Sequence, residues 1–290
     1  MTAAERGFRA HLDACNAHDL SRYLPWSVGE RRVGWIRRDR AARFLAGRAG
    51  FEVDAHGVRS RDPAGSAALQ KALDALSADL LAAGEPVDRT GELFAVSTRP
   101  RGEVVALLDR GVVPWFGVIA TGVHLDGFVR KGGELHLWIA RRSRKKLLHP
   151  GKLDKLVAGG QPHGLSLQEN LITECAEEAS LPPELARRAV ATGSVSYRME
   201  SERGIKPDTM FTYELELPAD FTPCNADGEV EAFELLPAEE VARLVRETDR
   251  FKFNCNLVLL SFFLRHDLLP DPPAELAALR AALQPDGARG

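Results

Sequence analysis

The chain has 290 residues, of which 44% are hydrophobic and 27% are charged, and its formal net charge is −3. This composition is typical of a soluble globular protein, and it excludes a disordered chain, a collagen-like repeat and a disulfide-stapled miniprotein. Because lysine and arginine total 38 against 41 acidic residues, the overall positive charge typical of nucleic-acid-binding domains is absent. At roughly 100–200 residues per domain, the length predicts about two domains.

The cysteines and the N-terminal sequence predict a cytoplasmic protein. Cys15, Cys175, Cys224 and Cys255 have neither CxxC spacing nor the spacing of a zinc site, so we expect reduced thiols. The N-terminal residues contain no long apolar segment, and no window has the roughly 18 apolar residues of a membrane span. We therefore expect neither a signal peptide nor a membrane-bound protein.

The first part of the chain has the pattern of a small α+β domain. Leucines at positions 69, 73, 76 and 80 recur at helical intervals. The elements expected here are helices at 8–17 and 66–83 and strands at 33–36, 51–53 and 93–97. The composition changes near residues 111–114, which predicts domains at 1–112 and 113–290.

The second part of the chain alternates strands and helices without regular βαβ units. Residues 115–125 and 128–130, followed by a Lys131-Gly132-Gly133 turn and the alternating residues 134–140, predict a β-hairpin. The later elements expected are helices at 167–180, 237–247, 256–266 and 275–283 and strands at 194–197, 210–217 and 232–235. This order predicts an α+β fold with helices packed on a mixed sheet.

Three carboxylates gather on one face of the helix at 167–180. Glu174, Glu177 and Glu178 share an arc of about 100°, and like charges at these spacings destabilise a helix. A hard divalent cation would compensate them, and Mg²⁺ is typical where phosphate is also bound. A solvated acidic face is the alternative, which the triplet alone favours. Glu169 lies on the other side of the helix, and with Ser166 it predicts a capping box.

A glycine-rich loop precedes this helix. Gly159 and Gly160 allow the backbone to approach a ligand closely, and a loop entering a helix places free N–H groups near an anion. A glycine-rich turn is weak support for a site when it stands alone. Its fixed distance from the three carboxylates is the stronger signal.

Residues 159–181 resemble the Nudix box, G-x5-E-x7-R-E-U-x-E-E-x-G-U, where U is an apolar residue. The positions that match in register are Gly159, Glu174, Cys175, Glu177, Glu178 and Leu181. Leu165, Thr173 and Ser180 stand where the pattern has Glu, Arg and Gly. The central Glu-x-x-Glu-Glu is retained, so the resemblance implies that the metal chemistry is retained.

Similarity over nearly the whole chain extends to a subgroup. Residues 24–26, 33–36, 153–160, 164–166, 211–218 and 251–254 resemble Nudix proteins that carry an extra N-terminal domain and are related to the Nudix part of fungal thiamine pyrophosphokinases. This resemblance implies a Nudix-type mixed sheet sandwiched by helices, preceded by a small α+β substrate-recognition domain. It also implies Mg²⁺-dependent cleavage, with Mn²⁺ as a substitute, of thiamine diphosphate or its damaged oxo and oxy analogues to the monophosphate.

Two other functions stay open at this point. The first is a Nudix hydrolase of another nucleoside diphosphate derivative, such as a sugar nucleotide or a dinucleotide. The second is a ligand sensor without catalysis, for which the missing Glu at position 165 is a mild argument.

The resemblance and the chemistry together predict which residues bind the metal and which residue is the general base. Diphosphate cleavage needs charge neutralisation and an aligned water. We expect Glu174, Glu177 and Glu178 to bind the metal. Glu174 or Glu229 would accept the proton of the attacking water, with Glu231 as the rival of Glu229. Glu200 and Glu202, in another polar loop, are weaker candidates.

The substrate contacts are predicted from the loops. Residues 141–155 hold seven basic residues, and of these Arg141 and Lys152 are expected to bind the diphosphate beside Gly159 and Gly160. Trp26, next to a proline in a loop, is the candidate for stacking on a heteroaromatic ring. The expected partner is a small-molecule diphosphate rather than nucleic acid, because the basic loop lacks interleaved aromatic residues. Monomer and homodimer stay open.

Overall fold

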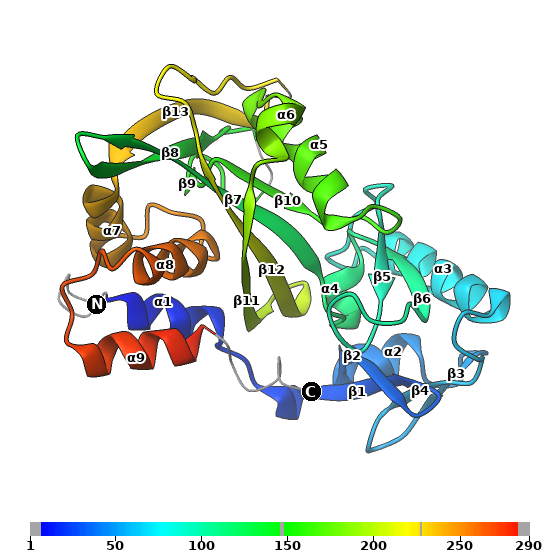
Figure 1. The fold of residues 1–290 in the computed structure, drawn as a ribbon. Helices are drawn as coiled ribbons and strands as arrows, with labels where there is room; N and C mark the ends of the chain where they lie inside the picture. The colour runs from blue at the N-terminus through cyan, green and yellow to red at the C-terminus, as the bar shows by residue number, and fades with distance from the viewer. Residues whose placement is uncertain (1–6, 146–147, 227, 284–290) are drawn as a thin grey trace.

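The computed structural model describes residues 7–145, 148–226 and 228–283, and Figure 1 shows its arrangement. In the first part of the chain a short sheet is covered by helices. Its strands lie in the order β2-β1-β4-β3, and β5 and β6 form a separate hairpin. The elements are α1 (Phe8–Cys15), η2 (Leu20–Arg22), β1 (Tyr23–Val28), β2 (Arg31–Arg37), α2 (Arg38–Phe44), β3 (Phe51–Val53), β4 (Val58–Ser60), α3 (Ala67–Ala82), β5 (Leu93–Val96), β6 (Ala106–Asp109) and α4 (Val113–Phe116).

The second part of the chain is built on a mixed sheet with the strand order β11-β12-β7-β8-β13. β12 runs parallel to β7, whereas β10 pairs antiparallel with β7 and β9 with β8. The elements are β7 (Thr121–Lys131), β8 (Glu134–Arg142), β9 (Leu153–Asp154), β10 (Val157–Gly160), α5 (Leu167–Ala179), α6 (Pro183–Ala186), β11 (Val190–Ser201), β12 (Gly204–Glu216), β13 (Val230–Pro237), α7 (Ala238–Glu247), α8 (Cys255–Arg265) and α9 (Pro273–Ala282).

Helices cover both faces of this sheet (Figure 1). Leu171 and Cys175 of α5 share a buried apolar cluster with Val123 and Leu125 of β7. On the other side α1, α7, α8 and α9 share a cluster that includes Phe128. The predicted α+β class, with a mixed sheet sandwiched by helices, is confirmed. None of the helices in the described part of the chain is long and apolar enough to cross a bilayer.

The hydrophobic clusters do not divide at one point of the sequence. The cluster of the first part runs from Leu24 to Val118, whereas Phe8 and Leu12 of α1 pack with the C-terminal helices. The leucines of α3 lie in the first cluster, as their spacing predicts. The division into two domains at residue 112 stays a proposal.

The strand expected from residue 115 begins later, at Thr121. Pro114 lies in the first turn of α4, a position that suits its fixed φ, and Gly117 ends the helix in the left-handed conformation with φ 58°. Trp115 and Phe116 of this helix are buried in the core. Aromatic and β-branched residues are common in buried helices as well as in strands, so this composition did not distinguish the two.

The prediction that Trp26 stacks on a ligand is wrong. Its side chain is fully buried, and its indole N–H donates to Ser60 Oγ at 3.0 Å. The ring packs against Phe116, with 5.2 Å between the ring centroids. Pro25 and Trp26 belong to strand β1, so this tryptophan is a core residue of the N-terminal sheet.

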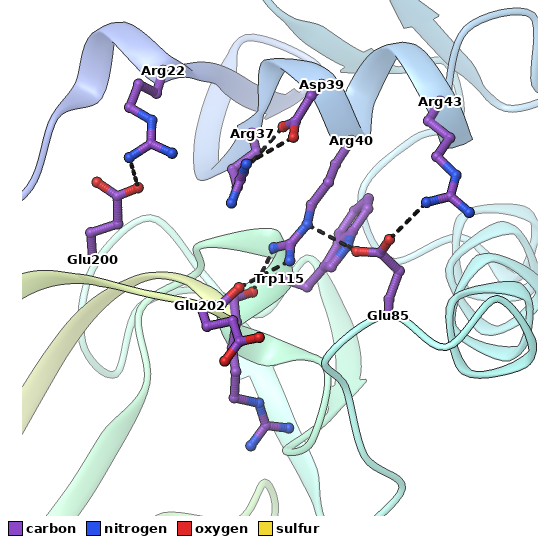
Figure 2. A network of polar contacts seen from close by, with 10 residues as sticks. Arg22, Arg37, Asp39, Arg40, Arg43, Glu85, Trp115, Glu200 and Glu202 are labelled. Atoms are coloured by element: carbon purple, nitrogen blue, oxygen red, sulfur yellow. Dashed lines mark hydrogen bonds and ion pairs between the residues drawn. The ribbon is translucent and has the colours of Figure 1, made fainter.

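A buried arginine joins the two parts of the chain, as Figure 2 shows. Arg40, on α2, is 8% exposed, and its Nε pairs with Glu85 at 2.9 Å. The two Nη atoms donate to the backbone carbonyls of Arg203 at 2.8 Å and Glu202 at 3.0 Å. Trp115 Nε1 also donates to Glu85 at 3.3 Å. The turn between β11 and β12 is thereby fixed to the N-terminal part.

We predict that Arg40→Met lowers the free energy of unfolding by about 3 kcal/mol, because Glu85 loses its buried partner and the carbonyls of Glu202 and Arg203 lose their donor. Urea denaturation measures this. Arg43→Met is the matched control, since Arg43 pairs with the same carboxylate at 3.3 Å but its side chain is 63% exposed, and exposed pairs contribute about 0–1 kcal/mol. Equal effects of the two substitutions would contradict this role of Arg40.

Candidate active site

A cavity of about 520 Å³ lies where the N-terminal part meets the mixed sheet. This volume is within the range of small-molecule sites, roughly 300–1,000 Å³. The basic residues that line it are Arg110, Arg142, Lys145, Arg203, Lys206 and Lys252, and the acidic ones are Asp88, Asp208 and Glu229. Phe94, Tyr197 and Phe253 add aromatic surface. The wall is therefore rich in cations and suits an anionic ligand that carries a ring.

Helix α5 begins with the predicted capping box. Ser166 Oγ accepts the Glu169 N–H at 3.2 Å, and the Glu169 carboxylate accepts the Ser166 N–H at 2.8 Å. These hydrogen bonds lower the pKa of Glu169. The capping box fixes the start of the helix, so Glu169 has a structural role and lies apart from the other carboxylates.

Strand β10 lies directly beneath two of the clustered carboxylates. A Cβ at Gly159 would lie 1.9 Å from Cδ of Glu174, so only glycine allows that carboxyl group its place. Glu178 is 9% exposed and accepts the Ala158 N–H at 2.8 Å. Gly159, expected in a loop, lies in strand β10 and allows the close approach of a side chain from the adjacent helix.

The clustered carboxylates repel one another. Burial, followed by the charge of Glu177, raises the pKa of Glu174 to about 7. Burial raises the pKa of Glu178 to about 8, against the effect of the Ala158 N–H. The charge of Glu229 acts in the same direction on both groups. Such a group of carboxylates is stabilised either by protons or by a cation.

The carboxylates suit a hard divalent cation by their donor type. Within the described residues, no three Asp, Glu, His or Cys side chains already surround a metal-sized point. Glu174, Glu177 and Glu178 still offer only oxygen donors, close to one another and to a cationic cavity. This is the donor set that Mg²⁺ prefers, so the residues fit the metal without forming a finished coordination shell.

A second loop brings Glu229 to the cavity. The Ala226 N–H donates to the Glu177 carbonyl at 3.2 Å, which ties this loop to the end of α5. The Ser143 N–H donates to the Glu229 carbonyl at 2.8 Å. Glu229 is thus held between α5 and β8 and lines the cavity.

The rival carboxylates point elsewhere. Glu231 pairs with Arg144 at 3.8 Å, and Glu200 pairs with Arg22 at 2.8 Å. Neither of them, nor Glu202, is among the residues that line the cavity. Among the candidates outside α5, the geometry favours Glu229.

The structure places Arg141 and Lys152, the expected diphosphate ligands, outside the cavity wall. Arg141 pairs with Glu234 at 2.9 Å and Lys152 pairs with Asp249 at 3.4 Å, and neither lines the cavity. Neighbouring residues of a strand point to opposite faces, so it is Arg142 that lines the cavity. The basic segment does supply Arg142 and Lys145 to the cavity wall, but the spacing of its residues does not reveal which side chains turn inward.

The sequence analysis did not predict most of the basic side chains that line the cavity. Arg110, Arg203, Lys206 and Lys252 come from three separate segments of the chain, since only Arg203 and Lys206 are neighbours in sequence. No local pattern connects them, because only the fold brings these segments together. Lys146 of the basic loop lies outside the described residues.

A buried polar cluster forms the cavity wall at β7. His124 lines the cavity, and its Nδ1 contacts Nζ of Lys155, which is 1% exposed. Burial lowers the pKa of both groups. Burial also raises the pKa of the Asp126 carboxyl to about 6. His124 of β7 is therefore part of the cavity wall.

The Ser180 departure from the Nudix box has a conformational cost. Ser180 ends α5 with φ 49° and ψ 35°, a left-handed conformation that costs a residue with a Cβ roughly 1–2 kcal/mol. Glycine, which the pattern has here, avoids this cost.

We predict that Ser180→Gly raises the free energy of unfolding by about 1 kcal/mol, because the relief of backbone strain exceeds the added freedom of the unfolded chain. Urea denaturation of the purified variant measures this. Ser180→Ala keeps the Cβ and should bring no gain. If alanine stabilises as much as glycine, backbone strain is not the cause.

The chain is similar to known proteins over most of its length. The chain is 36% identical over 284 residues to Nudix hydrolase 24, chloroplastic, of Arabidopsis thaliana, a match that covers 94% of this chain and 77% of that protein. It is also 36% identical over 285 residues to Nudix hydrolase 20, chloroplastic, of the same plant, covering 91% and 74%.

Among solved structures, DR0079 from Deinococcus radiodurans is 25% identical, with a TM-score of 0.43, and the match covers 58% of this chain and 96% of that one. No family model matches the chain. The matches to the two plant proteins extend over nearly the whole chain. The chain therefore belongs to the Nudix hydrolases, enzymes that act on phosphorus-containing anhydrides.

Proposed function

We propose that this Nudix hydrolase is a Mg²⁺-dependent pyrophosphohydrolase acting in the cytoplasm. Its substrate would be thiamine diphosphate or one of the damaged oxo and oxy analogues, which it cleaves to the monophosphate. The observation that supports this most is a cavity rich in cations that opens beside Gly159 and the α5 carboxylates. The first 112 residues would act as the substrate-recognition domain.

The cavity has the two chemical features that such a substrate needs. Six basic side chains supply positive charge for the diphosphate, and guanidinium groups bind phosphate oxygens in pairs. Phe94, Tyr197 and Phe253 supply apolar surface for a heteroaromatic ring. Asn254 also lines the cavity, and its side chain is hydrogen-bonded to Tyr197, which holds polar atoms beside this aromatic surface.

The chemistry divides between the metal and the side chains. Mg²⁺, with Mn²⁺ as a substitute, would be held by Glu174, Glu177 and Glu178 and would neutralise the diphosphate charge. Glu229 accepts the proton of the attacking water. Its position between α5 and β8 supports this role, because it lies at the cavity near Glu174 without belonging to the helix.

We predict that Glu177→Gln and Glu178→Gln each remove Mg²⁺-dependent phosphate release. Changing partners of metal ligands already costs about 10–100-fold, so losing a ligand should cost at least about 100-fold. Glu169→Gln is the matched control on the same helix, because glutamine preserves the capping box and activity should stay. A chelator should abolish the activity of the unchanged protein.

Turnover in the Glu177 and Glu178 variants equal to that of the unchanged protein would contradict the metal assignment. Glu229→Gln tests the base separately, and we expect a loss of kcat of about 100-fold or more. Full activity of Glu229→Gln would contradict its assignment as the general base and would favour Glu174 instead.

The substrate is tested with a panel of diphosphates and Mg²⁺. It contains thiamine diphosphate, its oxo and oxy analogues, a sugar nucleotide and a dinucleotide. We expect the highest kcat/KM within the thiamine group. If the dinucleotide or the sugar nucleotide is cleaved and the thiamine compounds are not, the substrate proposal fails while the reaction class stands.

A further inference from the structure

Arg110 comes from the N-terminal part of the chain but lies against the Nudix strand β10. It follows β6 and lines the cavity. A Cβ placed on Gly160 would lie 3.3 Å from Arg110 Cζ and 2.8 Å from Phe94 Cζ. The guanidinium also lies over the Phe94 ring, 5.9 Å from its centroid. The β5–β6 hairpin thus brings a cation to the strand that supports Glu174.

The carboxylates of α5 have no cation on their own helix. Helix α5 contains neither lysine nor arginine, and Thr173 stands where the Nudix box has arginine. The Thr173 hydroxyl donates to the Glu169 carbonyl at 3.1 Å, so it does not serve the carboxylates. Arg110 is instead the arginine beside this site, since its guanidinium lies against Gly160 and Glu174 lies against the neighbouring Gly159.

Arg110 is also the most available arginine of the cavity. Arg142 donates to Asp154 at 3.0 Å and to two backbone carbonyls. Arg203 pairs with Asp88 at 2.7 Å and likewise donates to two backbone carbonyls. Arg110 instead pairs with Glu92 at 2.7 Å, and these side chains are 49% and 42% exposed. Exposed pairs contribute little free energy, so a stronger anion can replace Glu92.

We propose that Arg110 binds the substrate diphosphate at the carboxylate end of the cavity and supplies the positive charge that α5 lacks. A guanidinium binds two phosphate oxygens at once, so the exchange of Glu92 for phosphate adds a charge-assisted hydrogen bond. The N-terminal part then contributes directly to the phosphate site of the second part. This inference rests on the proposed function.

The first test measures the binding of methylenediphosphonate, a diphosphate analogue that is not hydrolysed, by calorimetry with a chelator present. Hydrogen bonds to charged groups contribute about 1.5–3 kcal/mol, roughly 10–100-fold in affinity. We expect Arg110→Met to bind at least about tenfold more weakly and Arg110→Lys to fall between it and the unchanged protein. Arg89→Met, at an exposed position outside the cavity wall, should bind normally.

The second test separates this role from a structural one. Without Arg110, the carboxylates lose a nearby positive charge, so Arg110→Met should bind Mn²⁺ more tightly by a few fold while it binds the diphosphonate more weakly. Glu92→Gln should release the guanidinium and tighten diphosphonate binding. Damage to the fold would weaken the binding of Mn²⁺ and of the diphosphonate together, and that result would overturn the proposal. An unchanged diphosphonate affinity in Arg110→Met would also overturn it.

The outcome for the unchanged protein distinguishes the two proposals. If it neither binds methylenediphosphonate nor hydrolyses any diphosphate of the panel, the proposed function fails and the Arg110 inference fails with it. If the unchanged protein binds and hydrolyses diphosphates, and Arg110→Met binds methylenediphosphonate and Mn²⁺ with the same affinities, the Arg110 inference alone is wrong.

Discussion

The contact between strand β10 and helix α5 is the constraint on which the site depends. Gly159 leaves room for the carboxyl group of Glu174, and the Ala158 N–H holds Glu178. Carboxylates that would otherwise turn to solvent are therefore kept together, partly buried and at high electrostatic cost. A site that destabilises its own empty state in this way favours the binding of a cation.

The N-terminal part matters to this site because it closes the cavity. Phe94 and Arg110 reach it from the β5–β6 hairpin, and Arg203 reaches it from the β11–β12 turn. Arg40 holds that turn through two carbonyls, and Glu85 balances the buried charge of Arg40. The cationic wall therefore depends on contacts between segments more than 100 residues apart in sequence.

The sequence predicted the elements well where packing and local preference agree. The leucines of α3 and the capping box of α5 follow local rules, and the structure contains both. The prediction failed at Trp115, because an aromatic residue buried in a helix has the same composition signal as one in a strand. It failed at Trp26 because the segment with Pro25, which was expected to be a loop, forms strand β1 in the core.

The sequence by itself determined the carboxylate triplet and the glycines, since these are close in the chain and a helix has a fixed period. It also singled out Glu229 as a candidate. Only the tertiary structure decided which cations face the cavity, because Arg110, Arg142, Arg203 and Lys252 come from separate elements and each orientation depends on the neighbouring segment. Charge composition is a property of the chain, whereas charge placement is a property of the fold.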